Sequence, residues 1–337
     1  MLFRSAVDEL GLKIRPSIAG ASLKPGEARL GLTEPVRFEM EGKSFDAVPF
    51  AVLEETPSFL PSDIQGVAGW PLFKDYIVLL ELADQKATVG LETVPAEAAD
   101  WLRLRLRADH DSLCVELPEI AGAPGGLALV DTGDPGGVSL SAEKWQAWKA
   151  AHPRQPVTFS ANYMPGSGLV ATEESWAEKL SLGGLVLHHV VVRQCNVTQA
   201  SAGGPGYVAS LGLAALGRLD LVIDGKAGVA YTHARTEPPA AFPHNRLGAV
   251  FVPRDDRSDD LVAHVAAGSP AARAGIRDDD LLLGIDQRDL THWRTHPELL
   301  PLRKYWEQAA GTKVVLTVRR GTKTIKATAK LKNILGP

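Results

Sequence analysis

One aspartate has the neighbours expected of a carboxylate that does chemistry. The segment Leu127-Ala128-Leu129-Val130-Asp131-Thr132-Gly133 places Asp131 directly after an apolar run and ahead of a small hydroxyl residue and a glycine. A carboxyl group at such a position can act as a general acid or base. A D-T-G triplet occurs by chance in about one chain in fifteen of this length. The preceding apolar run, and the motif Ser210-Leu211-Gly212 roughly 80 residues later, make the pattern more specific than the triplet alone.

On these residues the sequence resembles the aspartic peptidases, in the bacterial form with two retroviral-protease-like lobes. In that family each Asp loop lies beside a strand ending in apolar-apolar-Gly, so the resemblance places Ser210-Leu211-Gly212 beside Asp131. Two carboxyl groups about 3 Å apart share a proton and together activate water for attack on a peptide carbonyl. The resemblance therefore implies a catalytic loop of Asp131, Thr132 and Gly133, in which the threonine hydroxyl anchors the loop and the glycine permits close approach. The alternative is that Asp131 lies in a solvated turn.

The sequence departs from the family pattern in two places. The first lobe has no D-T-G or D-S-G, and the spacing of the second lobe would put its aspartate about a dozen residues before Met1. We therefore expect that the chain as given starts after its first Asp loop. Asp8 is the nearest substitute, but its flanks are typical of a helix rather than an apolar strand. Asp134 stands where the family usually has Ala or Ser, and its charge is expected to raise the pKa of Asp131.

The C-terminal residues carry a second set of motifs. The segment Gly268–Ile276, followed by Asp279–Asp286, resembles the PDZ domains associated with bacterial proteases, which are small α+β barrels. The resemblance implies that the C-terminus of a peptide adds a strand to a sheet edge. It also assigns the carboxylate-binding loop to Leu247, Gly248, Ala249, Val250 and Phe251. The alternative is a closed groove in a module that only packs on the lobes. A helix over 297–308 and strands over 314–319 and 324–329 complete the expected order.

A weak internal repeat indicates that the part before the PDZ-like region consists of two similar lobes. Val67-Ala68-Gly69 precedes the apolar segment Tyr76–Glu81, and Ser210-Leu211-Gly212 precedes Leu219–Asp224 with the same spacing. Alternating strands such as Trp101–Arg107 and the scarcity of helical patterns indicate a mostly β protein. We therefore predict two retropepsin-like acid-protease β lobes at 1–107 and 108–235, a linker at 236–243 and a PDZ domain at 244–337. Further expected strands are 36–40, 47–53, 185–192 and 219–223, and expected helices are 3–10 and 142–151, the latter capped by Ser141.

Composition excludes several functional classes. The chain has 337 residues and a formal net charge of −4, which argues against nucleic acid as a partner. No apolar run is long enough to span a membrane, and the first residues do not resemble a secretion signal. Two cysteines, Cys114 and Cys195, are too few for a disulfide scaffold, and a buried thiol at each position is favoured over a bridge between them. No metal-ligand spacing and no phosphate- or dinucleotide-binding motif occurs, so we expect no metal or cofactor.

A faint similarity to trypsin-like proteases fails at the nucleophile. His152 and the segment Ala200–Pro205 resemble the His and Ser motifs of those enzymes, but Ala202 occupies the position of the serine. The sequence thus predicts an aspartic-type endopeptidase, or a shortened form of one, acting on proteins or peptides and carrying a PDZ domain for peptide C-termini. The alternative is a catalytically inactive scaffold that binds peptides or partner proteins. A dimer could supply the second aspartate, and the resemblance points to a location outside the bacterial cytoplasm.

Overall fold

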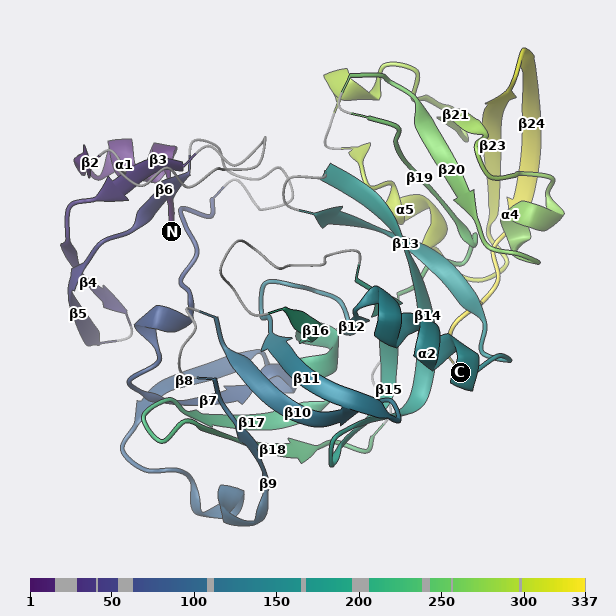
Figure 1. Ribbon diagram of the computed structural model, residues 1–337. Helices are drawn as coiled ribbons and strands as arrows, with labels where there is room; N and C mark the ends of the chain where they lie inside the picture. Colours follow the sequence, from purple (N-terminus) through teal and green to yellow (C-terminus); the bar gives the residue numbers. More distant parts are fainter. Residues whose placement is uncertain are drawn as a thin grey trace. The chain divides into compact units, whose positions relative to one another are not determined.

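The structure is a computed structural model that describes residues 1–15, 29–40, 42–53, 63–107, 112–164, 168–195, 206–237, 243–255, 257–296 and 299–336 (Figure 1). It is mostly β, with 48% strand and 15% helix. Within these residues no helix is long and apolar enough to cross a bilayer. Most of the predicted linker and the segment around Ala202 lie outside the described residues. The chain divides into two compact units, one formed by Met1–Leu72 with Tyr163–Val170 and the other by Phe73–Asn162 with Ala171–Pro337.

The first unit is a small sheet with one short helix. Its four strands have the order β1-β6-β3-β2. The helix α1 (Arg4–Glu9) buries Ala6 and Val7, as its apolar pattern predicts. Asp8 lies on this helix in an exposed ion pair with Arg4 at 2.8 Å, so it has no role resembling that of a strand-end aspartate. The strands are β1 (Leu2–Phe3), β2 (Ile14–Arg15), β3 (Arg29–Thr33), β6 (Ala51–Leu53) and the separate hairpin β4 (Val36–Met40) and β5 (Lys43–Val48).

In the second unit, the two copies of the sequence repeat meet in one five-stranded sheet of order β8-β7-β17-β18-β9. Strand β7 (Ile77–Glu81) and strand β17 (Leu219–Asp224) are the equivalent segments of the two copies, and they pair antiparallel. In the sequence, each follows a short helical turn after its glycine: α3 (Leu213–Leu216) before β17, and η1 (Trp70–Leu72), the last residues of the first unit's main segment, before β7. Strands from both sides of residue 107 share this sheet. The division into two lobes at that residue stays a prediction. The other strands are β8 (Lys86–Leu91), β9 (Leu102–Arg105) and β18 (Val229–Ala234).

A seven-stranded sheet of order β10-β11-β16-β12-β15-β14-β13 carries the D-T-G segment. Helix α2 (Ala142–Ala151) buries the stacked rings of Trp145 and Trp148. Its N-cap is Ser141, as predicted, whose Oγ accepts a hydrogen bond from the Lys144 backbone N–H. Cys114 lies buried in this sheet, and no disulfide joins it to Cys195. The strands are β10 (Cys114–Ile120), β11 (Ala123–Val130), β12 (Val138–Leu140), β13 (Val157–Met164), β14 (Gly168–Leu182), β15 (Leu185–Gln194) and β16 (Tyr207–Leu211).

The C-terminal residues form a six-stranded sheet of the order β19-β20-β21-β23-β24, with β22 paired to β21. The predicted helix over 297–308 is wrong in length: among the described residues of that range, α5 (Arg303–Trp306) is the only α-helical segment. Pro301 lacks the N–H that a helix interior needs, and Leu302 has a left-handed φ of 64°. The remaining elements are β19 (Ala249–Pro253), β20 (Leu261–Val265), α4 (Pro270–Arg273), β21 (Leu281–Ile285), β22 (Arg288–Asp289), η4 (Trp293–Thr295), β23 (Lys313–Arg320) and β24 (Lys323–Lys330).

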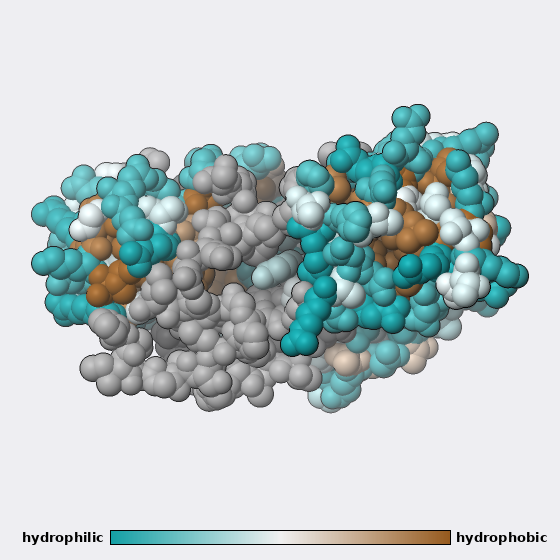
Figure 2. Space-filling model, turned by 90° about the horizontal axis from the view of Figure 1, so that it is seen from above, coloured by the Kyte–Doolittle hydropathy of each residue, from teal (hydrophilic) through white to brown (hydrophobic). Residues whose placement is uncertain are grey.

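The buried core consists mainly of apolar side chains from these strands and helices. In the space-filling view, the residues drawn in colour on the visible face are mostly hydrophilic, with apolar groups in small separate patches (Figure 2). This distribution is ordinary for a folded protein. The polar residues that are buried are therefore the informative ones, and several of them gather around the D-T-G segment.

Candidate functional site

Asp131 lies at the carboxyl end of β11, directly beside the segment Ser210-Leu211-Gly212. Strands β11 and β16 are parallel, with Val130 opposite Leu211. The backbone N–H of Asp131 donates to the Leu211 carbonyl at 2.9 Å. The structure thus brings together the two motifs that the sequence placed side by side.

Gly212 makes this approach possible because no side chain fits at its position. A Cβ on Gly212 would lie 2.4 Å from the carbonyl oxygen of Gly136 and 2.8 Å from that of Asp134. The N–H of Gly212 donates to the Gly137 carbonyl at 2.9 Å, and the N–H of Leu213 donates to the Asp134 carbonyl at 2.7 Å. The loop after Asp131 is therefore fixed by backbone contacts to the turn that begins α3.

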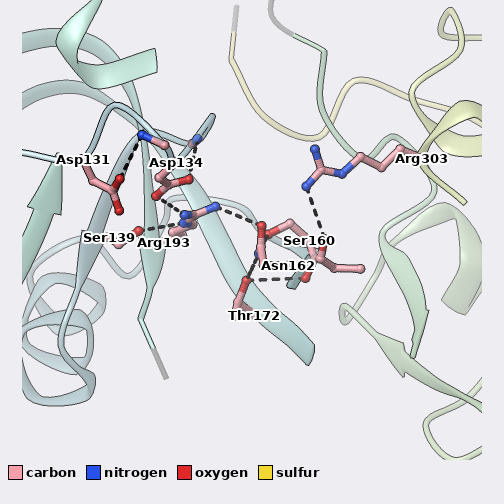
Figure 3. A network of polar contacts seen from close by, with 11 residues as sticks. Asp131, Asp134, Ser139, Ser160, Asn162, Thr172, Arg193 and Arg303 are labelled. Carbon is pink, nitrogen blue, oxygen red and sulfur yellow. Dashed lines mark hydrogen bonds and ion pairs between the residues drawn. The ribbon is translucent and has the colours of Figure 1, made fainter. Parts of the chain in front are cut away.

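The three residues of the predicted catalytic loop differ in exposure. Asp131 is half-buried, whereas Thr132 and Gly133 are exposed. The Gly133 N–H donates to Asp131 Oδ1 at 2.9 Å and orients that carboxyl group (Figure 3). The Thr132 hydroxyl has no hydrogen-bond partner among the residues that the structure describes, so the anchoring role expected from the resemblance is not seen here.

Beside Asp131, the carboxylate of Asp134 is held by an arginine that sequence reasoning did not single out. Asp134 Oδ1 accepts from the Gly136 N–H at 2.8 Å, and Oδ2 forms an ion pair with the guanidinium of Arg193 from β15. Figure 3 shows the guanidinium lying between Asp134 and Asn162. Arg193 also donates from Nε to Ser139 Oγ at 2.7 Å and from Nη1 to Asn162 Oδ1 at 2.9 Å. All three nitrogens of the guanidinium thus have acceptors, which fixes the Asp134 side of the loop.

Sequence reasoning missed Arg193 and Asn162 because both sit on long strands with no local motif. Arg193 follows the apolar run of β15, where a charged residue is ordinarily solvated at a strand end. Its side chain is only 14% exposed, and that of Asp134 is 15% exposed. The only signal in the sequence was Asp134 itself, an unexpected acid whose burial requires a cation.

The electrostatic environment favours the neutral form of Asp131. Burial raises the pKa of this carboxyl group above its ordinary value, and the charge of Asp134 raises it further. The hydrogen bond from the Gly133 N–H and the charge of Arg193 oppose the increase without cancelling it. The expected effect of Asp134 on the pKa of Asp131 therefore has the predicted direction.

A second acid lies deeper in the same polar network. Glu174 of β14 is 7% exposed and is paired in register with Arg193. Burial raises its pKa, while a hydrogen bond with Ser160 and the charges of Arg193 and Arg303 act in the opposite direction. Ser160, Asn162 and Thr172 continue the network along β13 and β14. Glu174 is part of the support behind the Asp131 loop rather than a group that solvent reaches.

The predicted carboxylate-binding loop opens β19 and is completely enclosed. Leu247, Ala249, Val250 and Phe251 each have an exposed fraction of 0%. Gly248 has a φ of +71°, and a Cβ there would lie 2.3 Å from Ser269 Cβ, so this position requires glycine. The turn directs the N–H groups of residues 247 and 248 toward one point, as a carboxylate-binding loop does. In the described part of the chain, no cluster of three or more His, Cys, Asp or Glu side chains could hold a metal ion.

The C-terminal region matches a known protein family. The sequence model of the PDZ domain family matches residues 261–320. The chain carries a PDZ domain at its C-terminus. This match supports peptide binding by the domain.

Further comparisons give distant similarities that extend beyond the PDZ domain. No curated protein matches the sequence. Among solved structures, basic 7S globulin from soybean is 13% identical with a TM-score of 0.37, over 71% of this chain and 81% of that one. An HtrA-type protease, AlgW with a tripeptide, is 12% identical with a TM-score of 0.23, over 76% and 92% of the two chains. Similarity at this level does not establish a shared fold.

Proposed function

We propose that this protein is an aspartic-type peptidase in which Asp131 is one of two catalytic carboxyl groups. The observation that supports this most directly is the position of Asp131 at the end of β11, oriented by the Gly133 N–H and packed beside Leu211 and Gly212. A raised pKa suits a carboxyl group that must carry a proton near the pH at which it works.

The chemistry assigns Asp131 the role of acid. Protonated Asp131 would donate its proton to the oxygen of the scissile carbonyl while an ionised partner carboxylate removes a proton from the attacking water. Asp134 is unsuited to be that partner because its carboxylate oxygens are held by Arg193 and by the Gly136 N–H. We propose that the partner carboxylate is Asp131 of a second copy of the chain.

Peptide cleavage by separated monomer and dimer fractions at pH 3–7 tests this proposal. We expect cleavage in the dimer fraction, loss of nearly all of it in Asp131→Asn, and no loss in the control Asp75→Asn, whose side chain is exposed on another part of the chain. Cleavage by the dimer that survives Asp131→Asn, or the absence of cleavage in every fraction, would overturn it.

A non-catalytic scaffold is the second candidate, and the exposed, unanchored Thr132 favours it. In that case Asp131 packs the loop, the PDZ domain binds peptides, and no hydrolysis occurs. Peptide binding to the full chain without cleavage, unchanged by Asp131→Asn, would select the scaffold.

We also propose that the PDZ domain prefers peptides with a free C-terminal carboxylate, which an amidated peptide would test.

A further inference from the structure

The N–H groups that should bind a peptide carboxylate already have an acceptor within the chain. Asn245 Oδ1 accepts from the N–H of Leu247 at 3.0 Å and from the N–H of Gly248 at 3.0 Å. The side-chain amide oxygen thus occupies the position that one oxygen of a peptide carboxylate would take. Asn245 is 3% exposed, so water does not compete for these bonds.

The nitrogen of the same side chain closes the neighbouring sheet edge. Asn245 Nδ2 donates to the carbonyl of Ala249 at 2.9 Å. Ala249 is opposite Val265, whose N–H donates to Asp278 Oδ1 on the side away from β19. In an antiparallel pair, the backbone N–H and C=O groups of two directly opposed residues either all point toward the partner strand or all point away from it. The Ala249 carbonyl therefore faces the free edge of β19, which is an edge strand in the described part of the sheet. An added peptide strand would need this edge.

Asn245 also ties this loop to β13. Nδ2 donates to the Phe159 carbonyl at 2.8 Å, and the Thr158 hydroxyl donates to the Asn245 carbonyl at 3.4 Å. A further bond links the same strand to α5, from Arg303 Nη2 to the Ala161 carbonyl at 3.3 Å (Figure 3). Both hydrogens of Nδ2 and both acceptor directions of Oδ1 are thus in use, which is the full capacity of an asparagine side chain.

We propose that Asn245 is an autoinhibitory plug of the PDZ carboxylate site, which a peptide C-terminus must displace before it binds. The exchange is feasible because a carboxylate is a stronger acceptor than a neutral amide oxygen. It is costly because Asn245 must give up four hydrogen bonds, three of them buried and the fourth, to Phe159 of β13, partly buried. Peptide binding at this site is therefore coupled to release of β13 from the loop.

Peptide affinity of the full chain tests this inference. The probe is a fluorescent peptide with an apolar last residue and a free carboxylate, together with its amidated form. We expect Asn245→Ala to bind the free acid at least about tenfold more tightly than the unaltered chain, with little gain for the amide. The control Asn333→Ala removes another asparagine whose Oδ1 accepts a single bond, from Arg246 Nε at 2.8 Å, and should leave the affinity unchanged.

Loss of folding is checked by a melting curve for each variant. If Asn245→Ala does not fold, Asn245→Ser replaces it, because serine stays polar but is too short to reach both N–H groups, and the same gain is expected. Equal affinity of the unaltered chain and a folded Asn245 variant would overturn the proposal. So would equal gains for the free acid and the amide. Both results are independent of any peptidase activity.

Discussion

In two loops of the second unit, backbone N–H groups bind a side-chain oxygen of the same chain, but one loop is exposed and the other is buried. After β11, one N–H, that of Gly133, holds Asp131 Oδ1, and the residues around it are exposed. Before β19, two N–H groups hold Asn245 Oδ1, and the residues around it are completely buried. The first loop leaves its carboxyl group partly exposed, whereas the N–H groups of the second already bind a side chain of the same chain. A loop of the correct shape is therefore not evidence of an available site.

The two regions also contain half-buried or buried acids, Asp131 and Asp280, whose pKa values shift in opposite directions. Burial and the like charge of Asp134 raise the pKa of Asp131, and the N–H groups of Gly133 and Asp134 together with the charge of Arg193 offset this only in part. Burial also acts to raise the pKa of Asp280 in the PDZ domain, but two hydrogen bonds from Arg320 and one from the Arg277 N–H outweigh it and lower that pKa. A directly paired cation, rather than burial alone, decides which form of these two acids the fold favours.

The largest effect is expected at the close contact behind Asp131. Gly212→Val places a branched side chain where Cβ alone would lie 2.4 Å from the Gly136 carbonyl, so the loop or the turn must move. We expect a loss of about 3 kcal/mol or more in the free energy of unfolding. Gly206→Val is the matched control, because a Cβ there meets nothing within 4 Å. Equal melting temperatures of the two variants would contradict the packing described here.

The sequence predicted part of this region. The residues around Asp131 indicated a strand-end aspartate, and the resemblance to the aspartic peptidases implied that Gly212 lies beside it. Arg193 and Asn245 could not be predicted, because a polar side chain on a strand or loop gives no local sign of the distant acceptor that it finds. The helix over 297–308 was expected from the order of elements in the PDZ resemblance, which took no account of Pro301 or of the left-handed φ of Leu302.

The second largest effect on stability is expected from Arg193, the cation that binds Asp134 in the Asp131 loop. Arg193→Ala leaves the Asp134 carboxylate 15% exposed with no counter-ion and removes the bonds to Ser139 and Asn162. We expect a loss of about 2–3 kcal/mol at pH 7, measured by denaturant unfolding. Adding Asp134→Asn should recover part of it, since no unpaired charge remains. The control Arg37→Ala removes an arginine that is 66% exposed and should change stability by less than about 0.5 kcal/mol. A loss at Arg193 as small as that of the control would show that the ion pair does not fix the loop.

In the PDZ domain, Asp280→Asn should destabilise at neutral pH by about 2 kcal/mol, because the asparagine loses the charge that Arg320 binds in a bidentate pair. The pKa of Asp280 is lowered by folding, so its contribution is present above the pKa of the unfolded chain, about 4, and is lost as the pH falls through the lower folded value. The difference in unfolding free energy between variant and unaltered chain should accordingly shrink below pH 4. A difference that is the same at pH 3 and pH 7 would refute the role of the charge. Asp259→Asn, at a more exposed acid of the same domain, is the control.

The smallest effect has the opposite sign and comes from Asp131. Its pKa is raised by folding, so the folded state is favoured by protonation: the stabilisation is fully present below the unfolded pKa, about 4, and is lost as the pH rises through the higher folded value. Replacing Asp131 with asparagine removes this loss, and the melting temperature should rise by about 1–3 °C at pH 7 while changing little at pH 3. The gain is small because the substitution also replaces a charged acceptor of the Gly133 N–H with a neutral amide oxygen. The exposed Asp75→Asn supplies the baseline for removing one negative charge. If Asp131→Asn destabilises the protein at pH 7, then the loop holds a carboxylate rather than a neutral acid, and Asp131 and Asp280 would no longer differ as the comparison requires.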